Sequence, residues 1–144
     1  MTSITRRKAL LSGLAATTGA VSADAAVAEL RRLPFTQVGD ALVDHHRALR
    51  TGTPEAVYGP GKSPEQCALI VGEMLANGEG PVLLTRVDDA QAKAALAAHP
   101  GSLRASNTLA WRLPDAPRND AHRVLVVSAG TADVPVVDEA VLTL

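Results

Sequence analysis

Cysteine and aromatic residues are scarce in this chain, and each shortage excludes a class of function. Cys67 is the single cysteine among 144 residues, which excludes an internal disulfide and a cysteine-based zinc site. Its place at the start of an apolar-periodic segment predicts a small buried side chain rather than a reactive thiolate. One Phe, one Tyr and one Trp are too few aromatic rings for a platform on which nucleic-acid bases stack.

The chain also lacks an excess of either charge and a long apolar run. Its 14 basic and 15 acidic residues give a formal net charge of -1, which argues against a nucleic-acid partner. Four histidines are too scattered for a convincing metal cluster, so we expect no metal site. The longest apolar run, residues 9–21, is too short to span a bilayer. We therefore expect a globular cytoplasmic protein with no membrane partner.

The amino terminus allows two interpretations. The letters RRK at 6–8, a run of small apolar residues and ADA at 23–25 resemble a twin-arginine export signal. The other interpretation is two ordinary helices, one over residues 6–14 and one capped by Ser22, whose hydroxyl accepts a bond from a free backbone amide. We favour the helices and keep export as the alternative.

Apolar periodicity and turn residues predict alternating strands and helices after residue 38. A short strand or turn is expected within 39–50, strands at 56–58, 82–85, 104–113 and 124–127, and helices at 64–76 and 89–98. This alternation indicates an α/β fold. The Pro- and Asp-rich residues 114–120 form the best linker. We expect an amino-terminal helix or export signal over 1–21, a small α/β domain over 22–118, and the start of a second α/β domain over 119–144.

The two central helices have recognisable starts and apolar faces. Ser63, with Pro at the first helical position and Gln66 in a capping box, begins the first helix. Asp88 or Asp89 begins the second. The residues expected to face inward are Leu69, Ile70, Met74 and Leu75 in the first helix and Ala92, Leu96 and Ala97 in the second.

Cationic groups beside glycines make residues 44–66 the strongest candidate for a binding site. Arg47 and Arg50 are three apart, so on a helix they face one side and could grip a phosphate. The sequence GPGK at 59–62 precedes a helix, where backbone amides and the Lys62 ammonium suit a phosphate. It is not a P-loop, because the GxxxxGK[ST] spacing is absent. The alternative is a mobile surface turn.

Two strand ends add further candidates. Thr85 and Arg86 end one expected strand and could reach the same ligand, although a lone Arg there is often a surface ion pair. The sequence SAGTAD at 128–133 follows the last expected strand, at the edge where open α/β sheets bind ligands. There Gly130 allows close backbone approach, and Asp133 either caps the following helix or carries a proton.

Taken together, these segments resemble one family. LRRLPF, DHHRALRTGTPEAVYGPGKSPEQ, the TR at 85–86 and AGTADVPVVDEA resemble LarB, the pyridinium-3,5-biscarboxylic acid mononucleotide synthase of nickel-pincer cofactor biosynthesis. The resemblance runs from about residue 22 to residue 144. The AGTAD turn is shared with the PurE-like (AIR carboxylase-like) domain, so the resemblance implies that residues 119–144 begin an incomplete flavodoxin-type domain.

The resemblance implies a reaction and assigns roles to residues. The substrates are nicotinic acid adenine dinucleotide and carbon dioxide, with no tightly bound cofactor. Carboxylation at C5 of the pyridinium and hydrolysis of the phosphoanhydride release AMP, and the product feeds the cofactor of lactate racemase. The residues assigned to substrate binding are Arg47, Arg50, Glu55, Lys62, Thr85, Arg86, Ser128, Gly130 and Thr131. Asp133 is assigned to catalysis, and Glu55 holds a ribose hydroxyl or orients a cation.

The sequence departs from the family pattern in ways that affect the expected activity. Ala132 stands where the family has Ser, and Thr53 replaces an aromatic residue. The family's PurE-like domain continues for about another hundred residues on domain-size grounds, so we expect this chain to be inactive alone and to oligomerise only with that domain complete. The alternatives are an AIR carboxylase-related protein of purine biosynthesis and a dinucleotide-binding module without turnover.

Overall fold

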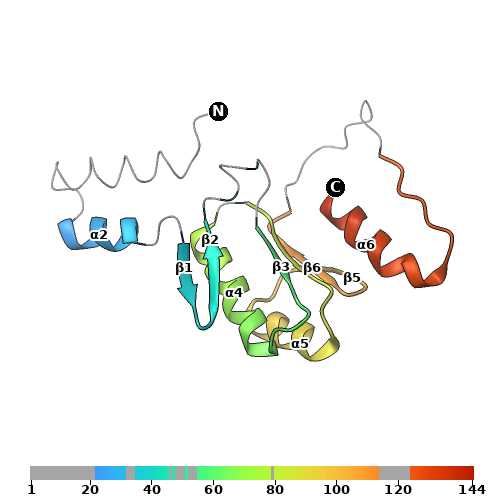
Figure 1. Cartoon of the computed structure of the whole chain (residues 1–144), viewed down its shortest axis with the longest axis horizontal. Coiled ribbons are helices and arrows are strands. Elements are labelled where there is room, and N and C mark those ends of the chain that lie inside the picture. Colours follow the sequence, from blue (N-terminus) through green and yellow to red (C-terminus); the bar gives the residue numbers. More distant parts are fainter. Residues whose placement is uncertain are drawn as a thin grey trace. The chain divides into compact units, whose positions relative to one another are not determined.

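A computed structural model describes residues 22–31, 35–45, 47, 51, 55–78, 80–113 and 124–144 (Figure 1). The chain divides into two compact units, Met1–Glu55 and Ala56–Leu144. Helices and strands alternate along the described residues, which confirms the α/β fold class. None of the described helices is long and apolar enough to cross a membrane. Residues 1–21, on which the export interpretation depends, lie outside the described residues.

The first unit contains a helix and a two-stranded hairpin. Helix α2 (Ala23–Arg31) begins as predicted, because Ser22 Oγ accepts a bond of 3.2 Å from the backbone amide of Ala25. Strands β1 (Phe35–Val38) and β2 (Ala41–Asp44) pair antiparallel across a two-residue turn. The first turn residue, Gly39, has φ +58°, a conformation that glycine adopts without strain and that tight hairpins require.

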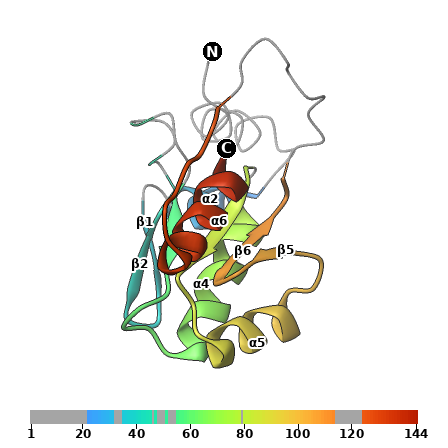
Figure 2. The ribbon, with the colours of Figure 1, turned by 90° about the vertical axis from the view of Figure 1, so that its right-hand side faces the viewer.

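The second unit is built on a four-stranded mixed sheet. Its strands are β3 (Ala56–Tyr58), β4 (Val82–Thr85), β5 (Leu103–Ala105) and β6 (Thr108–Trp111), in the order β3-β4-β6-β5. Strands β3 and β4 are parallel, and the other pairs are antiparallel. The single strand expected over 104–113 is therefore two strands joined by a tight turn (Figure 2). Positive φ at Ser106 reverses the chain there.

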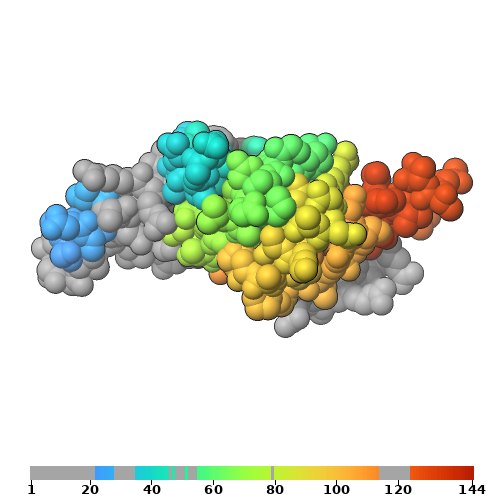
Figure 3. Space-filling model, turned by 90° about the horizontal axis from the view of Figure 1, so that it is seen from below, coloured from blue at the N-terminus to red at the C-terminus, as the bar shows by residue number. Residues whose placement is uncertain are grey.

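Helix α4 (Pro64–Asn77) connects the parallel strands, and helix α5 (Asp89–Ala98) follows β4. Both begin with capping boxes: the predicted one of Ser63 with Gln66, and one of Asp88 with Gln91, where only a cap by Asp88 or Asp89 was expected. In each box the first side chain accepts from a free helical amide while the glutamine accepts from the amide of the cap residue. The two helices lie side by side (Figure 3).

The buried stripe of α4 differs in part from the predicted one. Ile70 and Met74 are buried as expected, together with Cys67 and Val71. These four positions follow the i, i+3, i+4, i+7 spacing of one helix face. Leu69 lies off this stripe and is 57% exposed, so its predicted inward position is wrong. Among the predicted positions of α5, Ala92 is fully buried whereas Ala97 is exposed; Gln91 and Ala95 complete the buried face.

Long-range hydrogen bonds fasten α4 and α5 to β6. The indole Nε1 of Trp111 donates to the backbone oxygen of His99, the C-cap residue of α5, at 2.8 Å. The His99 ring nitrogen Nε2 lies 2.9 Å from the Ala68 oxygen of α4. Arg112 donates to backbone carbonyls at the carboxyl end of α4. Because buried polar groups need partners, these bonds fix the two helices against one face of the sheet.

The opposite side of the sheet carries helix α6 (Val134–Thr143), which a short 3-10 turn, η1 (Thr131–Asp133), precedes. Helix α6 packs against β5 and β6, and Figures 1 and 2 show it on the other side of the strands from α4. None of its residues is fully buried. The second unit is therefore a three-layer arrangement with one well-packed layer of helices and one thin layer.

The expected strand over 124–127 does not form. This segment is extended without strand pairing, and its side chains are solvent-exposed: 68% for Val124, 86% for Leu125 and 78% for Val127. An apolar strand without alternation is stable only when neighbouring strands and helices cover it. Within the part of the chain that the structure describes, no strand pairs with this segment.

Two adjacent residues of α4 test the observed stripe. Ile70→Ala should lower the free energy of unfolding by about 2–5 kcal/mol, because it opens a cavity in the core. Leu69→Ala should change it by less than about 0.5 kcal/mol, since that side chain is mostly in solvent. Urea unfolding followed by circular dichroism measures both variants. Equal losses at the two positions would contradict the observed orientation of α4.

Candidate functional site

The candidate site lies at the carboxyl ends of the parallel strands β3 and β4. The loop 59–62 leaves β3 and leads into α4, and Thr85 and Arg86 end β4. The two strand ends are joined directly, because the Gly59 amide donates to the Thr85 oxygen at 2.8 Å. Ligands of open α/β sheets bind at this edge. The structure thus brings the loop of Lys62 beside Thr85 and Arg86, as the sequence suggested.

The loop 59–62 is a tight turn with fixed geometry. The Lys62 amide donates to the Gly59 oxygen at 3.0 Å, which closes the turn. Pro60 occupies the second position and Gly61, with φ +81°, the third. This is the sequence requirement of a type II turn, since Pro presets its negative φ and Gly adopts the positive φ. The turn is a surface feature with a defined backbone.

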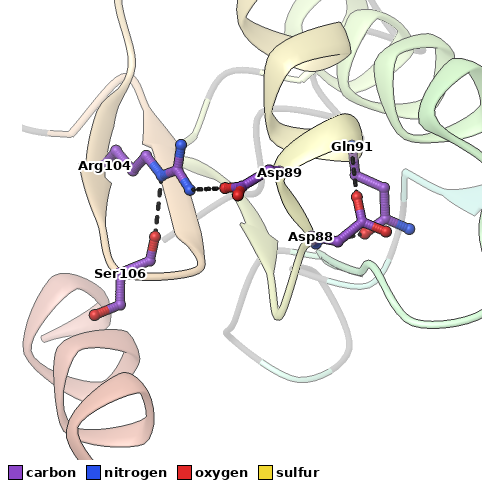
Figure 4. Close-up of polar contacts among 5 residues, drawn as sticks. All are labelled: Asp88, Asp89, Gln91, Arg104 and Ser106. Atoms are coloured by element: carbon purple, nitrogen blue, oxygen red, sulfur yellow. Dashed lines mark hydrogen bonds and ion pairs between the residues drawn. The ribbon is translucent and has the colours of Figure 1, made fainter.

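The buried side chain of Gln91 fixes this turn through hydrogen bonds. Its side chain is 4% exposed, and its Nε2 donates to the Gly59 oxygen at 2.9 Å and to the Lys62 oxygen at 2.6 Å. Its Oε1 accepts from the Asp88 amide at 2.9 Å (Figure 4). One buried amide therefore fixes the loop after β3 to the start of α5. Sequence reasoning did not select Gln91; its signal was the Asp-x-x-Gln capping box at 88–91.

Two cationic side chains gather around Tyr58, the last residue of β3. Lys62 Nζ donates to the Tyr58 oxygen at 2.7 Å. The Arg86 guanidinium lies 5.8 Å from the centre of the Tyr58 ring, within the range of a cation–π contact. Arg86 Nε also donates to Glu139 Oε2 of α6 at 3.2 Å. The surface ion pair considered for Arg86 is therefore present.

The backbone at the end of β4 is strained where the two strands meet. Arg86 has φ +54°, which a residue with a β-carbon adopts at a cost. A Cβ on Gly59 would lie 2.9 Å from the Thr85 oxygen and 3.1 Å from the Arg86 oxygen. Only glycine permits this approach. The conformation of Arg86 is thus set by the close contact with the loop after β3.

The comparison with protein families supplies the decisive observation. The family described as LarB/PurE-like N-terminal domain matches residues 35–111, more than half of the chain. This chain belongs to that family. The match begins with β1 and ends with β6, so it includes the loop of Lys62, the capping boxes and the end of β4. A search of curated proteins gave no match.

The chemistry of this LarB/PurE-like domain favours anion binding over covalent catalysis. The site combines two cations with the amino end of α4, where the helix dipole attracts negative charge. Cys67 is fully buried in α4, and burial raises the pKa of its thiol. It is therefore protonated at neutral pH and unsuited to act as a nucleophile. No group of three or more His, Cys, Asp or Glu that could hold a metal occurs among the described residues.

Other predicted site residues lie elsewhere in the LarB/PurE-like chain. Arg47 and Glu55 belong to the first unit, where Arg47 Nε lies 3.9 Å from Glu55 Oε2. Arg50 lies outside the described residues. The remaining members, all solvent-exposed and just before α6, are Ser128, Gly130, Thr131 and Asp133.

The expected capping role of Asp133 is not observed. Asp133 occupies the N-cap position of α6, but its side chain makes no capping hydrogen bond. Its backbone is already helical (φ -86°, ψ -11°) because Asp133 is the last residue of the 3-10 turn η1, whereas a capping side chain needs an extended backbone. The carboxyl-terminal segment instead reaches the site through Glu139 and contacts the β5–β6 turn through Asp138, which accepts from Ser106.

The close approach at Gly59 is testable with a matched glycine. Gly59→Ala should lower the free energy of unfolding by about 1–3 kcal/mol, because the new methyl group would press on backbone oxygens. Gly80→Ala should have little effect, since a Cβ there meets nothing within 4 Å. Thermal unfolding of both variants measures the difference. A stable Gly59→Ala variant would contradict the close approach of the two strand ends.

The role of Gln91 is testable against the second capping-box glutamine. Gln91→Met should destabilise the protein by about 1–3 kcal/mol, because it leaves buried carbonyl groups without partners. It should also speed hydrogen exchange of the Lys62 amide, since the turn loosens. Gln66→Met is the control: the Gln66 side-chain oxygen accepts from the Ser63 amide at an exposed helix start. Equal exchange rates for Lys62 in the two variants would argue against the assigned role.

Proposed function

We propose that this domain binds nicotinic acid adenine dinucleotide in nickel-pincer cofactor biosynthesis. The observation that carries the proposal is the position of Lys62 and Arg86 around Tyr58, on a loop that Gln91 holds in one conformation. The dinucleotide has two phosphates and a nicotinate carboxylate, so a cationic edge beside the positive end of a helix dipole suits it. Membership of the LarB/PurE-like family supports a carboxylase-related role.

In the proposed reaction this chain binds and orients the substrate. Lys62, beside the positive end of the α4 dipole, holds one phosphate, and Arg86 takes a second anionic group. Carbon dioxide bonds to C5 of the pyridinium ring, and the C5 proton leaves to a base, for which we propose Asp133. Hydrolysis of the phosphoanhydride then releases AMP and leaves pyridinium-3,5-biscarboxylic acid mononucleotide.

The residues of the first unit keep proposed roles in substrate binding. Arg47 and Arg50 are proposed phosphate ligands, and Glu55 orients Arg47, from which it lies 3.9 Å away. Ser128, Gly130 and Thr131 are proposed to line the place of the reacting ring, as the resemblance implies.

A carboxylase of purine biosynthesis is a second candidate, because the family description includes PurE as well as LarB. Both candidates add carbon dioxide to a ring that carries a ribose phosphate, and they differ in the substrate. Aminoimidazole ribonucleotide has one phosphate and no pyridinium carboxylate. Preferential binding of that ribonucleotide would favour the purine candidate.

The proposal is tested by calorimetric titration with nicotinic acid adenine dinucleotide, with NAD as the control ligand. We expect saturable binding that Lys62→Ala weakens about tenfold, the value of a hydrogen bond to a charged group. Lys93→Ala removes an exposed lysine from α5 and should leave binding unchanged. The proposal fails if the dinucleotide does not bind, or if both lysine variants bind as tightly as the unaltered protein.

A second measurement separates turnover from binding. The chain is incubated with the dinucleotide and bicarbonate, and AMP release is followed by chromatography. AMP release that Asp133→Asn abolishes supports catalysis by this chain. Binding without AMP release favours the dinucleotide-binding module.

A further inference from the structure

Two threonines at the end of the sheet face away from the α4–α5 layer. Leu84 of β4 and Leu109 of β6 are register partners, and both are fully buried against that layer. Because successive side chains of a strand point to opposite faces, Thr85 and Thr108 lie on the α6 side. Thr85 is 8% exposed and Thr108 is 0% exposed. Two hydroxyl groups therefore lie beneath α6, next to the strand end that carries Arg86.

One of these hydroxyl groups makes no hydrogen bond within the described residues. Thr108 Oγ1 has no hydrogen-bond partner among the described residues, although it is buried. A buried polar atom without a partner costs stability, and a valine of the same shape would avoid that cost. The Thr108 hydroxyl is therefore free to bond to a ligand group that approaches it, as are Ser102 Oγ and Asn107 Oδ1 in the described residues.

Helix α6 covers this place with a carboxylate and little apolar burial. Glu139 Oε2 lies 3.2 Å from Arg86 Nε, and the two side chains are 24% and 47% exposed. Val136 and Val141 of the same helix are 53% and 59% exposed. A helix held by a solvent-exposed ion pair, the exposed hydrogen bond from Ser106 to Asp138 and few buried apolar side chains is attached weakly.

We propose that Arg86, Thr85 and Thr108 form a subsite for an oxyanion, a carboxylate or a phosphate group, and that Glu139 occupies this subsite as an internal competitor. The inference rests on the proposed function, because it concerns the second anionic group of the same ligand. A ligand anion and the Glu139 carboxylate cannot both hold Arg86 Nε. Binding therefore displaces the Glu139 carboxylate from Arg86, and any change that weakens the Glu139–Arg86 contact strengthens binding.

The test measures the affinity of Glu139→Gln for three probes by calorimetry: nicotinic acid adenine dinucleotide, NAD and inorganic pyrophosphate. The variant should bind about two- to five-fold tighter than the unaltered protein, as expected for loss of an exposed ion pair. Arg86→Ala in the Glu139→Gln background should remove the gain, which a double-mutant cycle measures. Asp89→Asn is the control for net charge, since that carboxylate is 97% exposed and pairs with Arg104 (Figure 4).

A second variant tests the hydroxyl group directly. Thr108→Val keeps the side-chain shape and should weaken binding about threefold without lowering the melting temperature. A purely structural threonine would show the opposite result, a lower melting temperature with unchanged affinity, and that result would remove Thr108 from the subsite.

The three probes also separate this inference from the proposed function. If Glu139→Gln binds only the nicotinate dinucleotide more tightly, the ligand group that takes the place of Glu139 is a carboxylate. If it binds all three probes more tightly, that group is a phosphate. Tighter pyrophosphate binding without any dinucleotide binding supports the inference and removes the proposed function. Equal affinities of Glu139→Gln and the unaltered protein, or no binding of any probe to either, overturn the inference.

Discussion

The buried side-chain amide of Gln91 is the contact on which the candidate site depends. It donates to two carbonyls of the 59–62 turn and accepts from the amide that begins α5. A buried amide with all these bonds fixes the orientation of the groups around it, because any rotation leaves polar atoms without partners. The loop after β3, the start of α5 and the end of β4 are thus held as one body. The fixed arrangement of these three segments sets the positions of Lys62 and Arg86.

Local sequence signals predicted the parts of this arrangement that depend on neighbouring residues. The capping box at Ser63, a cap by Asp88 or Asp89 and the strand at 82–85 need only a few adjacent side chains, and they were predicted correctly. The orientation of α4 was predicted less well, because Leu69 and Val71 are both apolar and only tertiary packing selects between them. The expected strand at 124–127 was wrong for a related reason: its apolar run has the right composition, but a strand requires partners that no local pattern specifies.

The candidate site likewise combines features that neighbouring residues predict with contacts that only long-range packing produces. The GPGK turn and the arginine at the end of β4 were recognisable from their positions after strands and before a helix. The ion pair of Arg86 with Glu139 joins residues 53 positions apart, and the bonds of Gln91 to the turn span about thirty positions. Such contacts depend on how the layers pack, which the spacing of residues along the chain does not determine. The positive φ of Arg86 has the same origin, since it follows from the approach of Gly59.

The two cations of the site are unequal, and this inequality suggests an order of events. The Lys62 ammonium has three donors, and the oxygen of Tyr58 to which it donates is a neutral carbonyl, so its charge remains available to a ligand. The Arg86 charge is balanced by Glu139, whose hydrogen bond raises the pKa of the guanidinium. An approaching anion is therefore attracted first to Lys62 and the adjacent helix start. In the proposed complex, the second anionic group of a ligand held there competes with Glu139 at high local concentration. The weak intramolecular ion pair then delays the second contact without preventing it.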